Sequence, residues 1–179
     1  MLEIRKASLT DIHSLLELIN AYAVKGIMLP RTEFEMAENI RDFVVAFEDG
    51  KLVGCGALHF YTATSGEVRS LAVDPLVKAK GIGRAIVETL ELEAIQQDLH
   101  SLFAFTYVPG FFGKLGFEEV DRGELPLKAW KDCLRCPKFQ ACDEIAVLKR
   151  LKMETAPAPL PRLTQITDFP QLPVVRKQI

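Results

Sequence analysis

The spacing of hydrophobic and polar residues along the chain predicts a mixture of strands and helices. Residues 2–7 alternate between apolar and polar, as a half-buried strand does. Residues 12–22 place apolar side chains three to four positions apart, which predicts an amphipathic helix. The same two patterns predict further strands at residues 43–47, 52–61, 67–73, 102–106, 117–120 and 145–148, and further helices at residues 32–40, 82–91 and 111–115.

Short polar signals mark where several of these elements begin and end. Ser8 and Asp11 have the spacing of a capping box in front of the first helix. Asp49 and Gly50 are typical of a tight two-residue turn, which predicts an antiparallel hairpin. Pro75 follows the third strand of this series, and a proline cannot continue a central strand.

The order of the elements predicts an α/β (α+β) fold. Strands joined by hairpins come first and alternate with helices later, so we expect a mixed, mostly antiparallel sheet flanked by helices on both faces. Residues 157–179 hold five of the ten prolines, which excludes a regular element there. We therefore expect a folded domain over residues 1–150 and a proline-rich C-terminal arm over residues 151–179.

Composition and charge narrow the class of protein. Hydrophobic residues make up 49% of the chain and charged residues 26%, which is enough for a buried core. With 22 basic and 24 acidic residues, the net charge of −2 argues against a nucleic-acid binder and against a polybasic membrane binder. The chain contains no apolar run of membrane-spanning length, and its first residues do not resemble a signal peptide. We expect a cytoplasmic protein.

The four cysteines are too few for a secreted disulfide framework and indicate a reduced compartment. Cys133, Cys136 and Cys142 form a C-x2-C-x5-C cluster, and C-x2-C is the spacing of a zinc knuckle. A closed zinc site needs a fourth ligand, which Asp143 or Cys55 would have to supply. Free thiols and a redox-active pair are competing explanations, so we predict no metal.

Residues 68–84 are the segment most informative about chemistry. A strand ends at a proline, a basic loop follows, and Gly81 and Gly83 open a helix. Free N–H groups at a helix N-terminus attract anions, and glycines let a phosphate approach the backbone. Three basic residues add positive charge: Lys78, Lys80 and Arg84. The segment is neither a dinucleotide-binding G-x-G-x-x-G nor a P-loop, and a glycine-rich helix start also exists without a ligand.

Two motifs together resemble those of the GNAT acetyltransferase superfamily. Residues 78–83, Lys-Ala-Lys-Gly-Ile-Gly, are similar to its acetyl-CoA motif [Q/R]-x-x-G-x-[G/A], with lysine in the first position. Residues 111–117, Phe-Phe-Gly-Lys-Leu-Gly-Phe, are similar to its later F-Y-x-K-x-G-F motif. The resemblance covers residues 2–150. It implies a GNAT-like fold, acetyl-CoA as cosubstrate and an N-acetyltransferase domain over residues 1–150.

The resemblance also implies where acetyl-CoA binds. Backbone amides of residues 80–85 would hold the pyrophosphate, and the backbone of residues 71–73 would pair with the pantetheine arm. The N–H of Val73 would polarise the thioester carbonyl, and Phe111 and Phe112 would pack beside the arm. The expected coenzyme-binding residues are Leu71, Ala72, Val73, Lys78, Lys80, Gly81, Ile82, Gly83, Arg84, Phe111 and Phe112.

Catalysis needs a base for the amine, and an acid can assist the leaving thiolate. Glu67 resembles the glutamate that many relatives use as base, and His59 is a further candidate. Many relatives have a tyrosine where Phe112 stands, and Tyr107 is the nearest substitute in sequence. A thiolate can also leave unassisted, since the pKa of a thiol is about 8.5. Tyr107 as a core aromatic and Glu67 as an ordinary ion-paired strand residue are the structural alternatives.

The expected acceptor is an amino acid. Residues 67, 69, 71 and 73 should share one face of their strand, which puts Glu67 and Arg69 on the same side. Arg69, and Arg31 in the loop between the first two helices, suit binding of a carboxylate; solvated or ion-paired arginines are the alternative. Residues 106–109 and 125–144 resemble the short stand-alone N-acetylglutamate synthases of bacterial arginine synthesis. Lys128 and Lys131 are further contacts that this resemblance suggests.

The resemblance thus implies acetylation of the α-amino group of L-glutamate by direct attack of the amine in a ternary complex. The alternatives are acetylation of another small amine or a protein N-terminus, and a non-catalytic module that binds acyl-CoA or senses metal. The expected partners are a small-molecule amino acid and a second copy in a homodimer, with no nucleic acid and no membrane.

Overall fold

The computed structural model describes residues 1–77, 80–125, 136 and 138–151. Lys78, Lys128, Lys131, Cys133 and the C-terminal arm beyond residue 151 lie outside these residues, as do the predictions made for them. The described strands are β1 (Leu2–Lys6), β2 (Phe43–Glu48), β3 (Lys51–Phe60), β4 (Ser65–Val73), β5 (Ser101–Thr106), β6 (Glu118–Glu119) and β7 (Ile145–Arg150). The described α-helices are α1 (Ile12–Ala23), α2 (Glu33–Asn39), α3 (Ile82–Gln96) and α4 (Pro109–Gly113).

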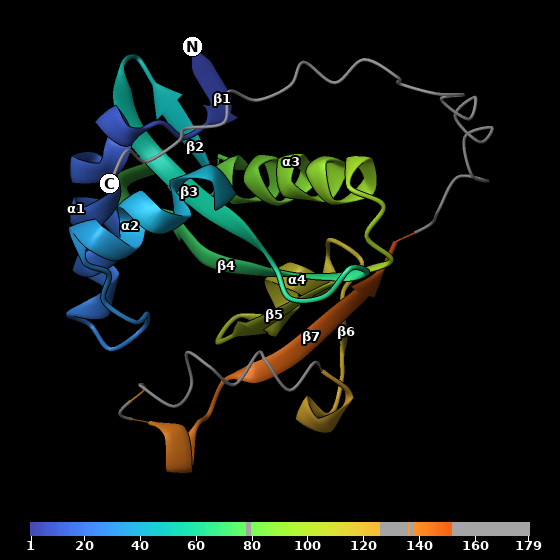
Figure 1. The fold of residues 1–179 in the computed structure, drawn as a ribbon. Helices are drawn as coiled ribbons and strands as arrows, with labels where there is room; N and C mark the ends of the chain where they lie inside the picture. Colours follow the sequence, from blue (N-terminus) through green and yellow to red (C-terminus); the bar gives the residue numbers. More distant parts are fainter. Residues whose placement is uncertain (78–79, 126–135, 137, 152–179) are drawn as a thin grey trace, which may run out of the picture.

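The strands form one seven-stranded sheet in the order β1-β2-β3-β4-β5-β7-β6. The neighbours pair antiparallel except β4 and β5, which are parallel. Helices α1 and α2 cover one face of the sheet, and α3 and α4 cover the other (Figure 1). The prediction of a mixed, mostly antiparallel sheet with helices on both faces is confirmed.

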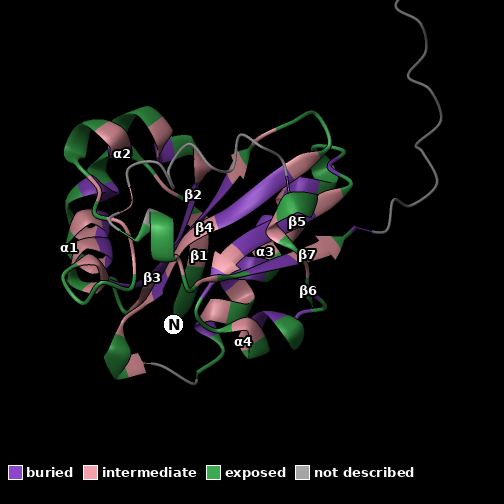
Figure 2. Ribbon diagram, turned by 90° about the horizontal axis from the view of Figure 1, so that it is seen from below, coloured by how far each residue is buried: buried purple, intermediate pink, exposed green. Residues whose placement is uncertain are grey.

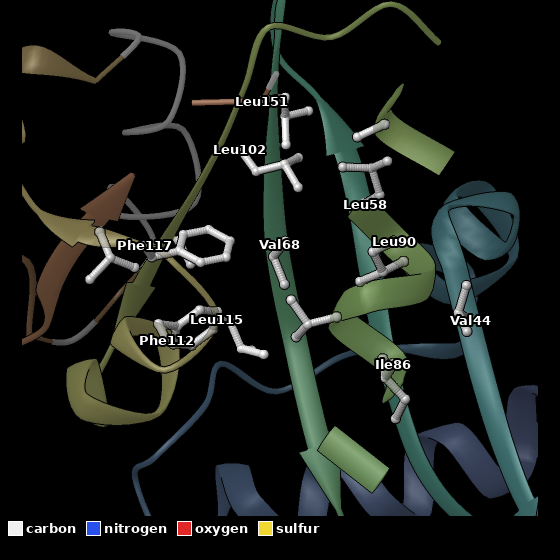
Figure 3. Packing of buried hydrophobic residues seen from close by; sticks show 14 of the residues in the cluster. Val44, Leu58, Val68, Ile86, Leu90, Leu102, Phe112, Leu115, Phe117 and Leu151 are labelled. Carbon is white, nitrogen blue, oxygen red and sulfur yellow. The ribbon is translucent and has the colours of Figure 1, made fainter. Parts of the chain in front are cut away.

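The larger part of the core lies between α3 and the sheet. Ile86 and Leu90 of α3 pack against Val44, Leu58 and Val68 of the central strands (Figure 3). Figure 2 shows the central strands as mostly buried, whereas the helices carry buried, intermediate and exposed residues. The apolar positions that the helical spacing marked are therefore those that the fold buries.

The local signals form as the sequence predicts. Asp11 accepts a hydrogen bond from the Ser8 backbone N–H at 2.8 Å, and two more from Arg5 at 2.8 and 2.9 Å. Asp49 and Gly50 have φ angles of 51° and 79° in the turn between β2 and β3. Both angles are positive, as a type I′ hairpin turn requires.

Strand β4 contains a β-bulge in the middle of its pairing with β3. Ala57 lies opposite Arg69 and Cys55 lies opposite Ala72, so one residue of β3 faces two residues of β4, Ser70 and Leu71. Ser70 has a φ of 52°, in the left-handed region that non-glycine residues seldom adopt.

The bulge overturns the prediction that residues 67, 69, 71 and 73 share one face. Glu67 and Arg69 do lie on one face, opposite alternate residues of β3, but Ala72 joins them there and packs in the cluster under α1 and α2. Leu71 and Val73 pack against the cluster under α3 instead. An extra residue in a strand shifts the alternation of its side chains by one, which period-2 reasoning does not detect.

Beyond Glu67, β4 and β5 separate. Their parallel pairing covers Ser65, Gly66 and Glu67 of β4 and ends where Glu67 faces Phe103. Past that point, no described strand pairs with β4 on the side away from β3. The backbone of residues 68–73 therefore has a free edge inside the molecule.

The close contact of β3 with α3 generates a stability prediction. A Cβ atom added at Gly56 would lie 2.8 Å from Ile86 Cγ2 and 3.3 Å from a methyl group of Leu90. We expect Gly56→Ala to lower the free energy of unfolding by about 1–3 kcal/mol because the core must shift to accept the methyl group. Urea denaturation measures this. Gly110→Ala is the control, since its added Cβ meets nothing within 4 Å; equal stability of the two variants would contradict the prediction.

A pH prediction follows from the Asp11 cluster. The guanidinium of Arg5, with further help from Ser8, lowers the pKa of Asp11 to about 2, below the ordinary 3.8. Because the pKa is lower in the folded state, the carboxylate stabilises the fold above about pH 4 and loses this effect as the pH falls from 4 to 2. Asp11→Asn should therefore lower the free energy of unfolding by about 2 kcal/mol at pH 7 and by less at pH 3.

Urea denaturation at the two pH values measures this difference. The exposed Asp98→Asn is the control. A destabilisation by Asp11→Asn that does not change between pH 7 and pH 3 would show that the ion pair is not its cause.

Candidate functional site

A cleft of about 1190 Å³ opens where β4 and β5 part. One wall consists of the C-terminal end of α1 and the loop after it, and the other of the segments around residues 105–114 and 136–144. Strand β4 forms its floor, and the first turn of α3 lies at one end. The cleft brings together most of the residues that the sequence singled out.

The first turn of α3 presents bare backbone to this cleft. Gly81 precedes the helix with a φ of 81°, and a Cβ added there would meet nothing within 4 Å. The first amides of a helix lack partners within it, so the N–H groups at the start of α3 and its dipole suit an anion. Gly81, Ile82, Gly83 and Arg84 all line the cleft, and their role as a pyrophosphate site stays a prediction.

The basic side chains near this turn differ in where they point. Lys80 is exposed, pairs with Glu48 at 3.1 Å and is not among the described residues that line the cleft. Arg84 lines the cleft while its guanidinium pairs with Glu88 at 3.3 Å. The backbone of this turn, more than Lys80, therefore suits a phosphate.

The free edge of β4 faces the middle of the cleft. Asp74 donates its N–H to the Val53 carbonyl of β3 at 2.8 Å, and strand residues alternate in direction, so Val73 points its N–H and C=O away from β3. The Val73 carbonyl accepts a hydrogen bond from the hydroxyl of Tyr22 at 2.6 Å. Leu71 and Val73 line the cleft, whereas the side chain of Ala72 is buried on the opposite face.

Tyr22 is a residue of the site that the sequence analysis did not identify. It falls on the apolar face of α1, where the helical spacing of residues 12–22 predicts a core position. Its only sequence signal is a hydroxyl on that face near the end of the helix, and a buried tyrosine hydroxyl needs a partner. Through Val73, it connects α1 to the strand that forms the floor of the cleft.

The two adjacent phenylalanines have different environments. Phe112 is 3% exposed and packs edge-on against Phe117, with ring centres 5.2 Å apart. Phe111 is half-buried, and its ring lies 3.4 Å from the place that a Cβ of Gly83 would occupy. Both rings line the cleft, with Phe111 the more accessible, and their packing beside the pantetheine arm stays a prediction.

Glu67, Arg69 and Arg31 line the other half of the cleft. Glu67 is 9% exposed, at the point where the two strands part. Arg31 is held through its backbone, because Asn20 of α1 accepts from its N–H at 2.9 Å and donates to its carbonyl at 3.0 Å. The predicted base and the two predicted carboxylate-binding residues thus lie in one cavity.

Arg69 also contacts an acidic group behind the cleft. Its Nη2 lies 3.7 Å from Asp42 Oδ2 and 3.4 Å from the side-chain oxygen of Asn39. The same Asp42 oxygen lies 2.7 Å from Nδ1 of His59. His59 is not among the described residues that line the cleft, so it lies behind Glu67 and not beside the reacting atoms.

Tyr107, the predicted acid, lies on the wall formed after β5. Its hydroxyl oxygen accepts a hydrogen bond from Lys138 Nζ at 3.1 Å. Loss of solvent around the phenol raises the pKa of Tyr107, and hydrogen bonding to Tyr107 lowers the pKa of Asp143. Tyr107 therefore keeps its proton at neutral pH, and its hydroxyl lies between the cation Lys138 and the anion Asp143.

The cysteines on this wall do not form a described metal site. Cys136 and Cys142 line the cleft, and Arg122 donates to the sulfur of Cys142 at 3.3 Å. The described residues include no cluster of three metal-ligating side chains. Because Cys133 lies outside them, the absence of a metal stays a prediction.

None of the described helices is long and apolar enough to cross a membrane.

Comparisons with known proteins agree with this architecture. Residues 39–119 match the acetyltransferase (GNAT) domain. An uncharacterized N-acetyltransferase of Chlorobaculum tepidum is 42% identical over 148 residues, which cover 83% of this chain and 96% of that protein. The chain belongs to the GNAT acetyltransferase family. Amino-acid acetyltransferase of Mycobacterium tuberculosis is similarly related, with 37% identity over 66% of this chain and 69% of its own length.

A solved GNAT structure supports the same relationship. N-acetylglutamate synthase of Neisseria gonorrhoeae, complexed with coenzyme A and N-acetyl-glutamate, superposes with a TM-score of 0.78 and 28% identity. The match covers 85% of this chain but 35% of that one, so the chain corresponds to about a third of the gonococcal enzyme. The predictions of the family, of an acetyltransferase and of acetyl-CoA as its cosubstrate are confirmed.

The turn at Gly81 allows a test of where the coenzyme binds. We expect Gly81→Asp to weaken CoA binding by about tenfold or more, because a carboxylate would replace open space beside the pyrophosphate. Aspartate tolerates positive φ and is favoured at a helix N-cap, so the variant should fold. Isothermal titration calorimetry with CoA measures the affinity.

Gly50→Asp is the matched control. Gly50 has a φ of 79°, and an added Cβ there also meets nothing within 4 Å, but it lies in the hairpin turn and is not among the described residues that line the cleft. If both variants bind CoA equally, the pyrophosphate does not lie at the start of α3.

Proposed function

We propose that this chain transfers the acetyl group of acetyl-CoA to the α-amino group of L-glutamate, the first step of arginine biosynthesis. The observation that carries the proposal is one cleft that joins a coenzyme end at α3 to an acceptor end with Glu67, Arg69 and Arg31. The similarity to enzymes named amino-acid acetyltransferase and N-acetylglutamate synthase supports the choice of an amino acid.

The coenzyme would extend along the free edge of β4. Its pyrophosphate would bind the N–H groups around Gly81, and its pantetheine arm would pair with the backbone of residues 71–73 as an added strand. The outward direction of the Val73 N–H and C=O supports this arrangement. A fixed N–H at the thioester oxygen would stabilise the oxyanion of the transition state by about 3 kcal/mol.

The acceptor would bind in the half of the cleft that contains the arginines. Glutamate has two carboxylates, and Arg31 and Arg69 offer guanidinium groups that bind carboxylates in two-pronged geometry. Glu67 would take a proton from the ammonium group, and the resulting amine would attack the thioester carbon in a ternary complex.

The thiolate of CoA would then leave with help from Tyr107. The phenol retains its proton at neutral pH, because the surrounding protein raises its pKa. Lys138, which donates to the phenol oxygen at 3.1 Å, would stabilise the charge that develops there when the proton moves to sulfur.

We further propose an N-acetyltransferase domain over residues 1–150, a separate arm over residues 151–179, and a cytoplasmic homodimer. The sheet and its helices account for the described part of the first segment. Gel filtration with light scattering tests the oligomeric state.

An acceptor screen tests the substrate. We expect acetyl-CoA-dependent thiol release to be fastest with L-glutamate, slower with L-glutamine and slowest with diamines, because the cleft offers two guanidinium groups to carboxylates.

Arg31→Gln should raise KM for glutamate by about tenfold to a hundredfold, because one charge-assisted contact with the substrate is lost. Arg41→Gln is the control, since Arg41 is exposed and not among the described residues lining the cleft. Preference for a cationic amine would remove the assignment of glutamate.

A further inference from the structure

The proposed reaction must release one proton per turnover from a buried base. An acceptor ammonium loses two protons when it becomes an amide, and one of them replaces the proton that Tyr107 gives to the departing thiolate. The other proton passes to Glu67, which is 9% exposed at the inner end of the cleft. With the coenzyme and acceptor bound in front of it, Glu67 needs another way to return this proton to solvent.

His59 lies directly behind Glu67 on the neighbouring strand. The two residues are partners in the register of β3 and β4, so their side chains share the face under α1 and α2. Directly opposed residues of antiparallel strands have Cβ atoms about 4.5–5.5 Å apart. The side chain of His59 is 28% exposed and is not among the described residues that line the cleft, so its exposed part faces solvent outside the cleft.

Asp42 fixes the orientation and the tautomer of His59. Its Oδ2 lies 2.7 Å from Nδ1 of the imidazole. An ionised carboxylate can only accept, so in the neutral ring Nδ1 carries the hydrogen and Nε2 has the lone pair. This is the tautomer that a proton acceptor needs at Nε2.

The other groups around His59 suit transient protonation. Two charged residues of β4 face it, Glu67 and Arg69, and Arg69 balances the charge of Asp42 at 3.7 Å. From its own strand, the ring of Tyr61 packs edge-on with centres 5.0 Å apart. The ring thus has the carboxylate of Asp42 at Nδ1, that of Glu67 on the paired strand, and the guanidinium of Arg69 beside Asp42.

We propose that His59, held by Asp42, is a relay residue that carries the acceptor's proton from Glu67 to solvent, an inference that rests on the proposed role of Glu67 as base. The Glu67 carboxylate takes the proton from the ammonium group and becomes a carboxylic acid. The acid passes the proton to Nε2 of His59, which restores the carboxylate. The imidazolium then releases the proton from Nε2 to water, and Nδ1–H keeps donating its hydrogen bond to Asp42.

The test is the dependence of the rate on buffer in His59→Gln. We expect kcat to fall at least about tenfold, with little change in the KM values, because the base would be regenerated slowly. Adding imidazole at constant pH and ionic strength should restore part of the lost rate, since a small base can replace the relay. The wild-type rate should not depend on imidazole. The control is His13→Gln, whose side chain is 85% exposed on α1.

Asp42→Asn is the second variant, for use also if His59→Gln does not fold. An asparagine can donate to Nδ1 and so stabilise the wrong tautomer, and we expect a smaller loss of kcat with the same rescue by imidazole. A His59→Gln enzyme with wild-type kcat overturns the relay. A loss of kcat without rescue, and with the pH profile of the wild type, also overturns it, because a purely structural role predicts that result.

The failure of the relay and the failure of the proposed function give different results. All rates are measured with whichever acceptor the wild type acetylates fastest, so a different substrate leaves the test intact. A Glu67→Gln enzyme with full activity would show that Glu67 is not the base, and it would overturn the relay as well. If Glu67→Gln is inactive while His59→Gln is fully active and does not respond to buffer, the relay is overturned and Glu67 remains the proposed base.

Discussion

The site depends on the separation of two parallel strands that are paired at one end. At the paired end, the Thr64 carbonyl accepts from the N–H groups of His100 and Ser101 at 2.8 and 3.1 Å, and the register runs as far as Glu67. Past Glu67, the neighbouring strand moves away and the β4 backbone must satisfy its polar groups elsewhere. The Val73 carbonyl uses the hydroxyl of Tyr22. A strand edge left unpaired along a cleft suits an extended ligand that carries amide groups.

The bulge at Ser70 gives this edge two different chemical faces. Before it, Glu67 and Arg69 lie under α1 and α2, near the loop that contains Arg31. After it, Leu71 and Val73 lie on the side of α3, near the turn at Gly81. A regular strand would have put all four side chains on one face. The extra residue therefore separates an ionic half of the cleft from an apolar half that leads to the helix N-terminus.

The features that could be predicted from the sequence are those that depend on residues close together in the chain. Periodicity located every described strand and α-helix, and the signals at Asp11 and Gly50 formed as expected, because caps and turns depend on a few adjacent residues. The glycine turn at Gly81 was also predictable, since only its backbone matters. The bulge was not, because Ser70 has no feature that marks a positive φ.

Contacts between distant segments were equally hidden from the sequence. Lys80 has the position of a phosphate-binding residue but pairs with Glu48, which the sheet order brings close. Asp42 and His59 are 17 residues apart in sequence, and they come into contact because β3 runs back alongside β2 as far as its first residue. Tyr107 meets Lys138 only because β7 follows β5 in the sheet.

The phenylalanine at position 112 illustrates how packing decides which residue can supply an acid. At 3% exposure, with aromatic neighbours at 5.2 Å on two sides, a hydroxyl there would be buried among rings that accept hydrogen bonds poorly. Phenylalanine suits this position, so the acid that we propose comes from another element. Among the described residues, Tyr22 and Tyr107 are the tyrosines that line the cleft, and the hydroxyl of Tyr22 is committed to Val73. Tyr107 has a cation on its oxygen and a retained proton, and the role that we propose for it as the acid rests on these two features.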